Sequence, residues 1–311
     1  MVYLSTVSIM KKYFGVLTAL MLVVVSGCTP SDIDDGGNNG NTPSTVSGLL
    51  PGVFTVDDQG HKIGFSQGIL LYFWRGENEG KWKFAEHQWD VSATDAIAHY
   101  CWGCSGYPHG ANVTSPIAYS DGHTEDFYAY GDPKAKLGDK TGKADWGYNP
   151  ILNGGNKEGL WRTPGASELG HIMSRRTTAS GLRYVLAKID GKRGVIFLPD
   201  DWKESTYTFT NPNSREYGTY DKNVISTSDW TKTLEPAGCV FIVAAGLLKS
   251  WLDDFPRPVA RSGEEGHYWV NAPHPGDATE CGIYFLGPSD ASTGYQVRWA
   301  GYSVRLVRDV E

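Results

Sequence analysis

Residues 183–199 read "RYVLAKIDGKRGVIFLP" and contain two apolar, β-branched runs around a short polar centre. Runs of this kind, bounded by glycine, aspartate or proline, are typical of β-strands. Asp190-Gly191 between them is a strong signal for a tight hairpin turn, because both residue types tolerate a positive φ. The stretch therefore predicts an antiparallel hairpin and a β-rich fold.

Similar runs occur along the rest of residues 48–311. They are "GVFTV", "ILLYFW", "CVFIVAAG", "HYWVNA", "GIYFLG" and "YSVRLVRD". One segment has a helical period instead: in "TPGASELGHIMSRR" (163–176), Leu169, Ile172 and Met173 fall at i, i+3 and i+4, and Glu168 stands three residues after Gly165 as in a capping box. Residues 100–160 are rich in glycine, polar and aromatic residues, and we expect a long packed excursion of loops there.

The N-terminus predicts export. Lys11 and Lys12 precede an apolar run, Phe14 to Val25, which is too short for a membrane span of ~20 residues. The following Val25-Ser26-Gly27-Cys28 resembles a bacterial lipobox, so residues 1–27 are predicted to be a lipoprotein signal peptide and Cys28 the lipidated (palmitate-bearing) residue. Residues 28–47 lack aromatic side chains and are predicted to be a flexible tether.

The predicted signal peptide also affects the net charge of the mature chain, and the residues after it bear on its location. The formal net charge is −7, and loss of Lys11 and Lys12 makes it more negative by two, so no basic footprint for nucleic acid is present. The acidic stretch Ser31 to Asp35 resembles the surface-export signal of Bacteroidetes-type lipoproteins. We therefore expect an outer-membrane lipoprotein held by its lipid anchor and exposed on the cell surface. The periplasmic leaflet is the alternative.

Cys101 and Cys104 flank a Trp-Gly pair in "HYCWGCSGYPHG" (99–110). A redox pair needs its first cysteine at a helix N-terminus, but a turn-like sequence follows here, and no spacing indicates a zinc site. In an exported chain a local disulfide is the first expectation. Unpaired thiols, pairing elsewhere, and redox or metal chemistry remain alternatives. Cys239 and Cys281 are expected to be buried thiols.

Six motifs in order carry a family resemblance. They are "WRTPGASELGHIMSRR", "GVIFLPDDW", "LEPAGCVFIVAAG", "GHYWVNAP", "IYFLG" and "GYSVRLVRDV". This series resembles a group of Bacteroidetes surface lipoproteins related to the Fibrobacter succinogenes major paralogous domain. The resemblance implies an α+β, C-type-lectin-like fold of the subtype shared with formylglycine-generating enzymes. Such a fold has paired terminal strands, antiparallel sheets with one or two flanking helices, and a long loop-rich region.

The sequence nominates no catalytic residues, cofactor or metal site. The Glu-Pro-Asn, Gln-Pro-Asp and Trp-Asn-Asp motifs of calcium lectins are absent, and Asp200-Asp201 fits a turn or helix cap better than calcium. The paired C-terminal cysteines of formylglycine-generating chemistry are also absent, since residues 282–311 contain no cysteine. No nucleophile elbow or zinc-protease motif occurs.

Aromatic side chains remain as candidates for ligand binding, because Trp and Tyr faces pack on sugar rings and anchor protein interfaces. Trp161, Trp202, Trp230 and Trp269 lie in family motifs and are expected in the core. The candidate ligand-binding residues are Tyr107, Tyr128, Tyr130, Asp145, Trp146, Tyr148 and Trp251.

The leading hypothesis is a non-enzymatic, surface-anchored lipoprotein that binds a glycan or protein ligand through its loop-rich end. One alternative is an extracytoplasmic enzyme, either a hydrolase or a thiol-dependent oxidoreductase. The other is a structural or adhesive surface subunit.

Overall fold

The predicted hairpin is present at the centre of the largest sheet. The computed structural model describes residues 47–102, 145–216, 218–248, 259–277, 280–287, 291–298 and 300–311, all within one unit, Ser44–Glu311. Strands β6 (Tyr184–Ile189) and β7 (Lys192–Phe197) pair antiparallel, with Ile189 opposite Lys192. Asp190 and Gly191 have φ values of 50° and 72°, as a tight hairpin turn of the predicted kind requires.

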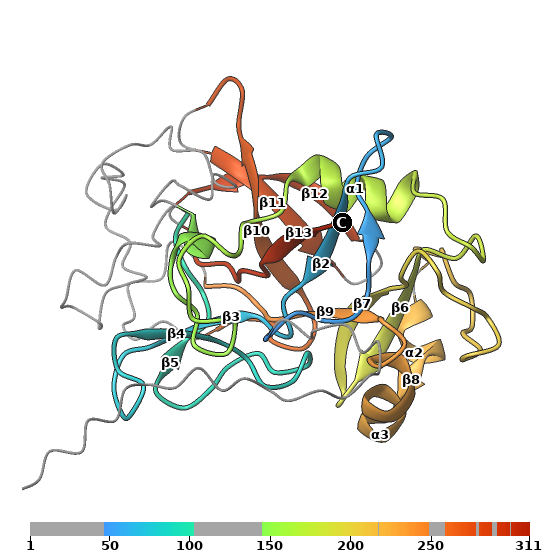
Figure 1. Ribbon diagram of the computed structural model, residues 1–311, viewed down its shortest axis with the longest axis horizontal. Coiled ribbons are helices and arrows are strands. Elements are labelled where there is room, and N and C mark those ends of the chain that lie inside the picture. The colour runs from blue at the N-terminus through green and yellow to red at the C-terminus, as the bar shows by residue number, and fades with distance from the viewer. Residues whose placement is uncertain are drawn as a thin grey trace, which may run out of the picture. The chain divides into compact units, whose positions relative to one another are not determined.

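Two further strands complete this sheet, in the order β8-β6-β7-β9. Strand β8 (Val224–Ile225) runs parallel to β6, and β9 (Val240–Val243) runs antiparallel to β7. Position 194 on β7 has room only for glycine, because a Cβ there would lie 2.3 Å from the ring of Phe241 on β9. Three short helical segments lie beside the sheet (Figure 1): α2 (Thr219–Lys222), α3 (Thr227–Asp229) and the π-helical turn η3 (Trp230–Leu234).

The second sheet carries the longest helix. Strands β10 (Gly266–Pro273), β11 (Glu280–Leu286) and β12 (Ala291–Val297) are antiparallel neighbours in that order. Helix α1 (Ala166–Ser174) packs against them (Figure 1). Its predicted apolar face is confirmed, since Leu169, Ile172 and Met173 are all buried. The predicted contact at its start is confirmed as well, because Glu168 Oε2 accepts a hydrogen bond from Gly165 N at 2.6 Å.

Two smaller sheets contain the remaining strands. One has the order β4-β3-β5, with β3 (Leu70–Phe73), β4 (Lys81–Phe84) and β5 (Ala96–Ile97). The other has the order β1-β2-β13, with β1 (Phe54–Thr55), β2 (Lys62–Phe65) and β13 (Val307–Val310). In the latter, β2 pairs antiparallel with both β1 and β13, so the two ends of the unit's sequence meet in one sheet (Figure 1).

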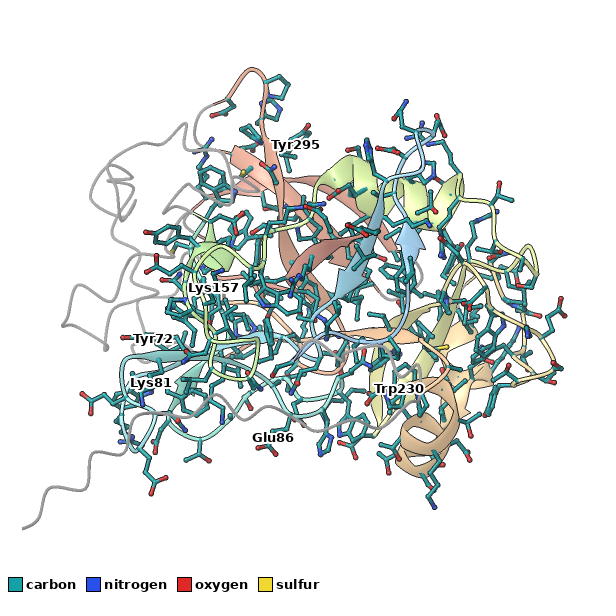
Figure 2. All side chains as sticks on the ribbon, viewed as in Figure 1. Tyr72, Lys81, Glu86, Lys157, Trp230 and Tyr295 are labelled. Atoms are coloured by element: carbon teal, nitrogen blue, oxygen red, sulfur yellow. The ribbon has the colours of Figure 1, made fainter. Side chains whose placement is uncertain are left out.

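Four sheets and few helices place the described residues in the α+β or mainly β class. The four tryptophans expected in the core are all buried, with exposed fractions between 0 % and 2 %. Figure 2 shows one of them, Trp230, beside α3. Within the described ranges, no helix is both long and apolar enough to cross a membrane.

Candidate functional site

The predicted ligand-binding residues divide into two groups. Tyr107, Tyr128, Tyr130 and Trp251 lie outside the described residues, as does Cys28. Of the others, Tyr148 is half-buried, whereas Asp145 and Trp146 are fully buried. Their burial contradicts the predicted role of Asp145 and Trp146 as surfaces for a ligand.

Asp145 has a structural role instead. It precedes the short helical turn η2 (Trp146–Tyr148), and its Oδ1 accepts a hydrogen bond from Gly147 N at 2.8 Å. The same carboxylate accepts bonds from the backbone N and the hydroxyl of Thr163, at 3.1 to 3.2 Å. Asp145 therefore fixes the turn to the segment that leads into α1. Trp146 packs in the core with Tyr100, at a ring separation of 6.1 Å.

The cysteines give no reactive centre among the described residues. Cys101 is buried and Cys104 lies outside the described ranges, so the disulfide stays a prediction. Cys239 and Cys281 are buried free thiols, as expected; Cys239 directly precedes β9, whereas Cys281 lies on β11 of another sheet. Burial raises the pKa of Cys281 to about 12, which keeps it a neutral thiol. In the described part of the chain, no group of three or more metal-ligating side chains is placed to hold a metal ion.

Two adjoining cavities lie where the β1–β2 turn, α1 and β13 meet. The first, called here the α1 cavity, has a volume of about 440 Å³. The second, called here the β13 cavity, has a volume of about 480 Å³. Their walls share Val56, Asp57, Arg162 and Glu168. Most of the lining side chains are polar or charged, which distinguishes these cavities from the mostly apolar pockets typical of drug-sized ligands.

The β1–β2 turn forms one wall and is held by its own first aspartate. Asp57 Oδ1 accepts hydrogen bonds from the backbone N of Gln59 at 3.0 Å and of His61 at 3.1 Å. Its Oδ2 lies 2.5 Å from His61 Nδ1, and this bond lowers the pKa of Asp57 below its usual value. These bonds fix the turn, so that Asp58 stands at the cavity edge with a largely exposed carboxylate.

Arg162 forms the wall between the two cavities. Its guanidinium donates to both oxygens of Glu168, at 2.7 and 2.8 Å, and to Asp309 Oδ1, at 2.7 and 2.9 Å. Burial alone would lower the pKa of Arg162, but the hydrogen bonds and charges of Glu168 and Asp309 outweigh it and raise that pKa above its usual value. Its backbone also pairs with Val307 at the start of β13. Arg162 thus fastens α1 to β13 and leaves Glu168 little capacity for a further partner.

Helix α1 supplies the opposite wall of the α1 cavity. Glu168, His171 and Arg175 follow one another at i, i+3 and i+7, along one side of the helix that adjoins the side of its buried apolar residues. His171 is buried, and its Nδ1 lies 3.8 Å from Asp58 Oδ1 across the cavity. Arg175 is exposed at the end of the helix.

The side chains that line the α1 cavity differ in whether they already form hydrogen bonds or ion pairs with other protein groups. Asp57, Arg162 and Glu168 hold the walls together through the bonds described above. The side chains of Gln59, Ser167 and Asn271 make no hydrogen bond to other described residues, and Asp58 and Arg175 have at most a long contact. A wall with donors and acceptors on three different elements can bind a hydroxyl-rich ligand through several hydrogen bonds.

Sequence reasoning identified α1 but not this site. The apolar positions of α1 predict its buried face, and the polar positions Glu168, His171 and Arg175 recur with the same helical period and are the sequence signal for the side that lines the cavity. Nothing in the local sequence of Asp57 and Asp58 shows which helix their turn approaches. That information lies in the packing of β1 against α1.

Comparison with protein-family models, curated proteins and solved structures finds no match for this chain. The resemblance to the Bacteroidetes lipoproteins therefore stays a prediction.

Proposed function

We propose that the chain is a lipid-anchored, non-enzymatic surface protein and that it binds a glycan in the α1 cavity. The observation that carries this proposal is the set of polar side chains without a hydrogen bond to other described residues, Asp58, Gln59, Ser167 and Asn271, on the walls of one cavity. Hydroxyl groups of a sugar both donate and accept hydrogen bonds, so amide, carboxylate and hydroxyl side chains match them. Binding at this cavity replaces the loop-rich end as the proposed site on the described residues.

Two of the carboxylates that line the cavity already accept hydrogen bonds from the protein, and this favours ligand binding over glycoside hydrolysis as the function. Glycoside hydrolysis needs two carboxyl groups, one of which acts as a proton donor. Glu168 accepts two hydrogen bonds from Arg162 and one from Gly165 N, and Asp57 accepts bonds from its own turn. Among the described carboxylates of the α1 cavity, Asp58 alone is without such bonds to the protein. One available carboxylate suits hydrogen bonding to a hydroxyl better than the two-carboxylate reaction.

The finer description of the fold is part of the proposal. The pairing of β2 with β13, and the placement of α1 against an antiparallel sheet, agree with the C-type-lectin-like arrangement that the sequence motifs imply. We propose this fold for residues 48–311, carried on the tether 28–47 at the outer face of the outer membrane.

For the anchor, Cys28→Ala is expected to move the protein from the membrane fraction to the soluble fraction, because removal of the acyl chains removes their insertion free energy of ~0.8 kcal/mol per buried CH₂. Labelling with radioactive palmitate and membrane fractionation of the producing cells measure this. Cys281→Ala is the matched control and should stay labelled and membrane-bound, since Cys281 is a buried core thiol. Continued labelling of the Cys28→Ala protein would refute the anchor.

For the site, the double variant Asp58→Ala/Asn271→Ala is expected to weaken binding of the best glycan about five- to a hundredfold. Each lost hydrogen bond contributes about 0.5–1.5 kcal/mol, and every 1.4 kcal/mol corresponds to tenfold in affinity. A glycan array selects the ligand, and titration calorimetry measures it on the folded unit. Glu86→Gln, an exposed acidic change outside the cavity (Figure 2), is the control.

Two results would count against this assignment. If the folded protein captures no glycan on the array, the proposed binding function is wrong. If it captures one and the double variant binds as tightly as Glu86→Gln, the site lies elsewhere.

A further inference from the structure

The two consecutive arginines at the end of α1 are used in opposite ways. Arg176 is 1 % exposed, and its guanidinium donates to Asp200 and to the carbonyl oxygens of Arg183 and Leu198. Arg175 is exposed, lines the α1 cavity and forms no ion pair with any described residue. The chain therefore buries the guanidinium of Arg176 as a structural group and presents that of the preceding Arg175 to the cavity.

The other charges that line the α1 cavity already have partners. Arg162 is paired with Glu168 and Asp309, and Asp57 with His61. Asp58 faces His171 at 3.8 Å. Among the described side chains of this cavity, Arg175 is thus the one arginine that forms no ion pair.

A free guanidinium beside hydroxyl-binding groups indicates the chemistry of the ligand. Its planar fork matches a carboxylate through two parallel hydrogen bonds, whereas a neutral hydroxyl uses only part of it. Asp57, Asp58 and Glu168 line the same cavity and disfavour a single group with two negative charges, such as a phosphate monoester, beside Arg175. Ser167 and Asn271 on the same walls can bind ring hydroxyls.

We propose that the α1 cavity selects a glycan that contains a uronic acid, with the uronate carboxylate paired to Arg175. This assignment rests on the proposed glycan-binding function and names the class of sugar that the site takes. The hydroxyl groups of the uronate contact Asn271 and Ser167, and the carboxylate supplies the charge that Arg175 lacks.

The test compares a trigalacturonate with its methyl ester, which has the same hydroxyl groups and no charge. Titration calorimetry on the wild-type protein should show a preference for the acid of about ten- to a hundredfold, the range of a hydrogen bond to a charged group. Arg175→Gln should bind both sugars with the affinity that the wild-type protein has for the ester. Arg175→Lys should keep part of the preference, because it retains the charge but loses the fork.

The control variant is Lys157→Gln, which removes an exposed positive charge apart from α1 (Figure 2) and should keep the full preference. Equal unfolding midpoints of Arg175→Gln and the wild-type protein establish that both are folded. A sulfated trisaccharide is the third ligand. If it binds in an Arg175-dependent manner and the trigalacturonate does not, the uronate assignment is wrong.

The remaining outcomes separate this inference from the function on which it rests. If acid and ester bind equally well, or if Arg175→Gln and Lys157→Gln keep the same preference, the uronate assignment is overturned while glycan binding stands. If no sugar of any class binds the folded wild-type protein, glycan binding itself is overturned.

Discussion

Replacement of Arg176 by alanine is expected to lower the free energy of unfolding by about 3–5 kcal/mol, the usual result of breaking a buried ion pair. Its Nη1 donates to Asp200 Oδ1 at 2.7 Å, and its Nη2 donates to Leu198 O at 2.6 Å. Asp200 in turn accepts from the backbone N and hydroxyl of Thr55 on β1. Truncation would leave the buried carbonyl of Leu198 without this donor and would loosen β1 from the body.

The adjacent Arg175 provides the comparison for this prediction. Arg175→Ala should change the free energy of unfolding by less than about 0.5 kcal/mol, as is usual for an exposed side chain without a specific contact. Urea denaturation of both variants, followed by tryptophan fluorescence, measures the difference. Similar losses for the two variants would show that Arg176 does not hold the structure in the way described.

Mild acid is expected to destabilise the folded unit well before its carboxylates are protonated. His99 and His267 are buried, and burial lowers the pKa of each imidazole to about 4. The unfolded chain binds a proton at each of these residues below a pH of about 6.5, whereas the folded chain does not until pH 4. Stability is therefore complete above pH 6.5 and declines between pH 6.5 and pH 4, by about 2–3 kcal/mol for each histidine at pH 4.5.

His267 is the better position for a test of this decline. Neither of its ring nitrogens has a hydrogen-bond partner in the described structure, and the nearby Glu265 is engaged by Arg261. The ring stacks on Tyr302 at 4.8 Å, a contact that a phenylalanine ring can keep. His267→Phe should match the wild-type stability at pH 7.5 and lose about half as much by pH 4.5.

Urea unfolding at a series of pH values between 7.5 and 4.5 measures how the free energy of unfolding of each protein changes with pH. His267→Leu serves as a second variant in case the larger phenylalanine ring does not fit. If both variants lose stability in parallel with the wild-type protein, the buried imidazole of His267 is not the source of the acid sensitivity.

Local sequence was sufficient for the elements whose own residues determine their conformation. The β6–β7 hairpin follows from its apolar runs and from Asp190-Gly191, which adopt the positive φ values that such a turn needs. Helix α1 follows from its apolar period and from Glu168 at its start. In these cases the decisive contacts lie within a few residues of one another.

Elements that depend on distant partners were not predicted. Strand β12, "ASTGYQV", is polar because it lies at the edge of its sheet, so it lacks the apolar run of a buried strand. The burial of Asp145 and Trp146 depends on Thr163 and Tyr100, which a polar, glycine-rich sequence does not identify. The α1 cavity likewise depends on three segments that meet only in the folded chain.

The pairing of β2 with β13 has a consequence for the order of events in biogenesis. These strands come from opposite ends of the folded unit's sequence, so their sheet cannot close until the final strand has been synthesised. Contacts between such distant segments also slow folding, because a long loop must be closed first. A polypeptide of this topology stays unfolded for longer after leaving the ribosome, which fits the proposed export, in which the chain would be threaded through a secretion channel before it acquires its final shape.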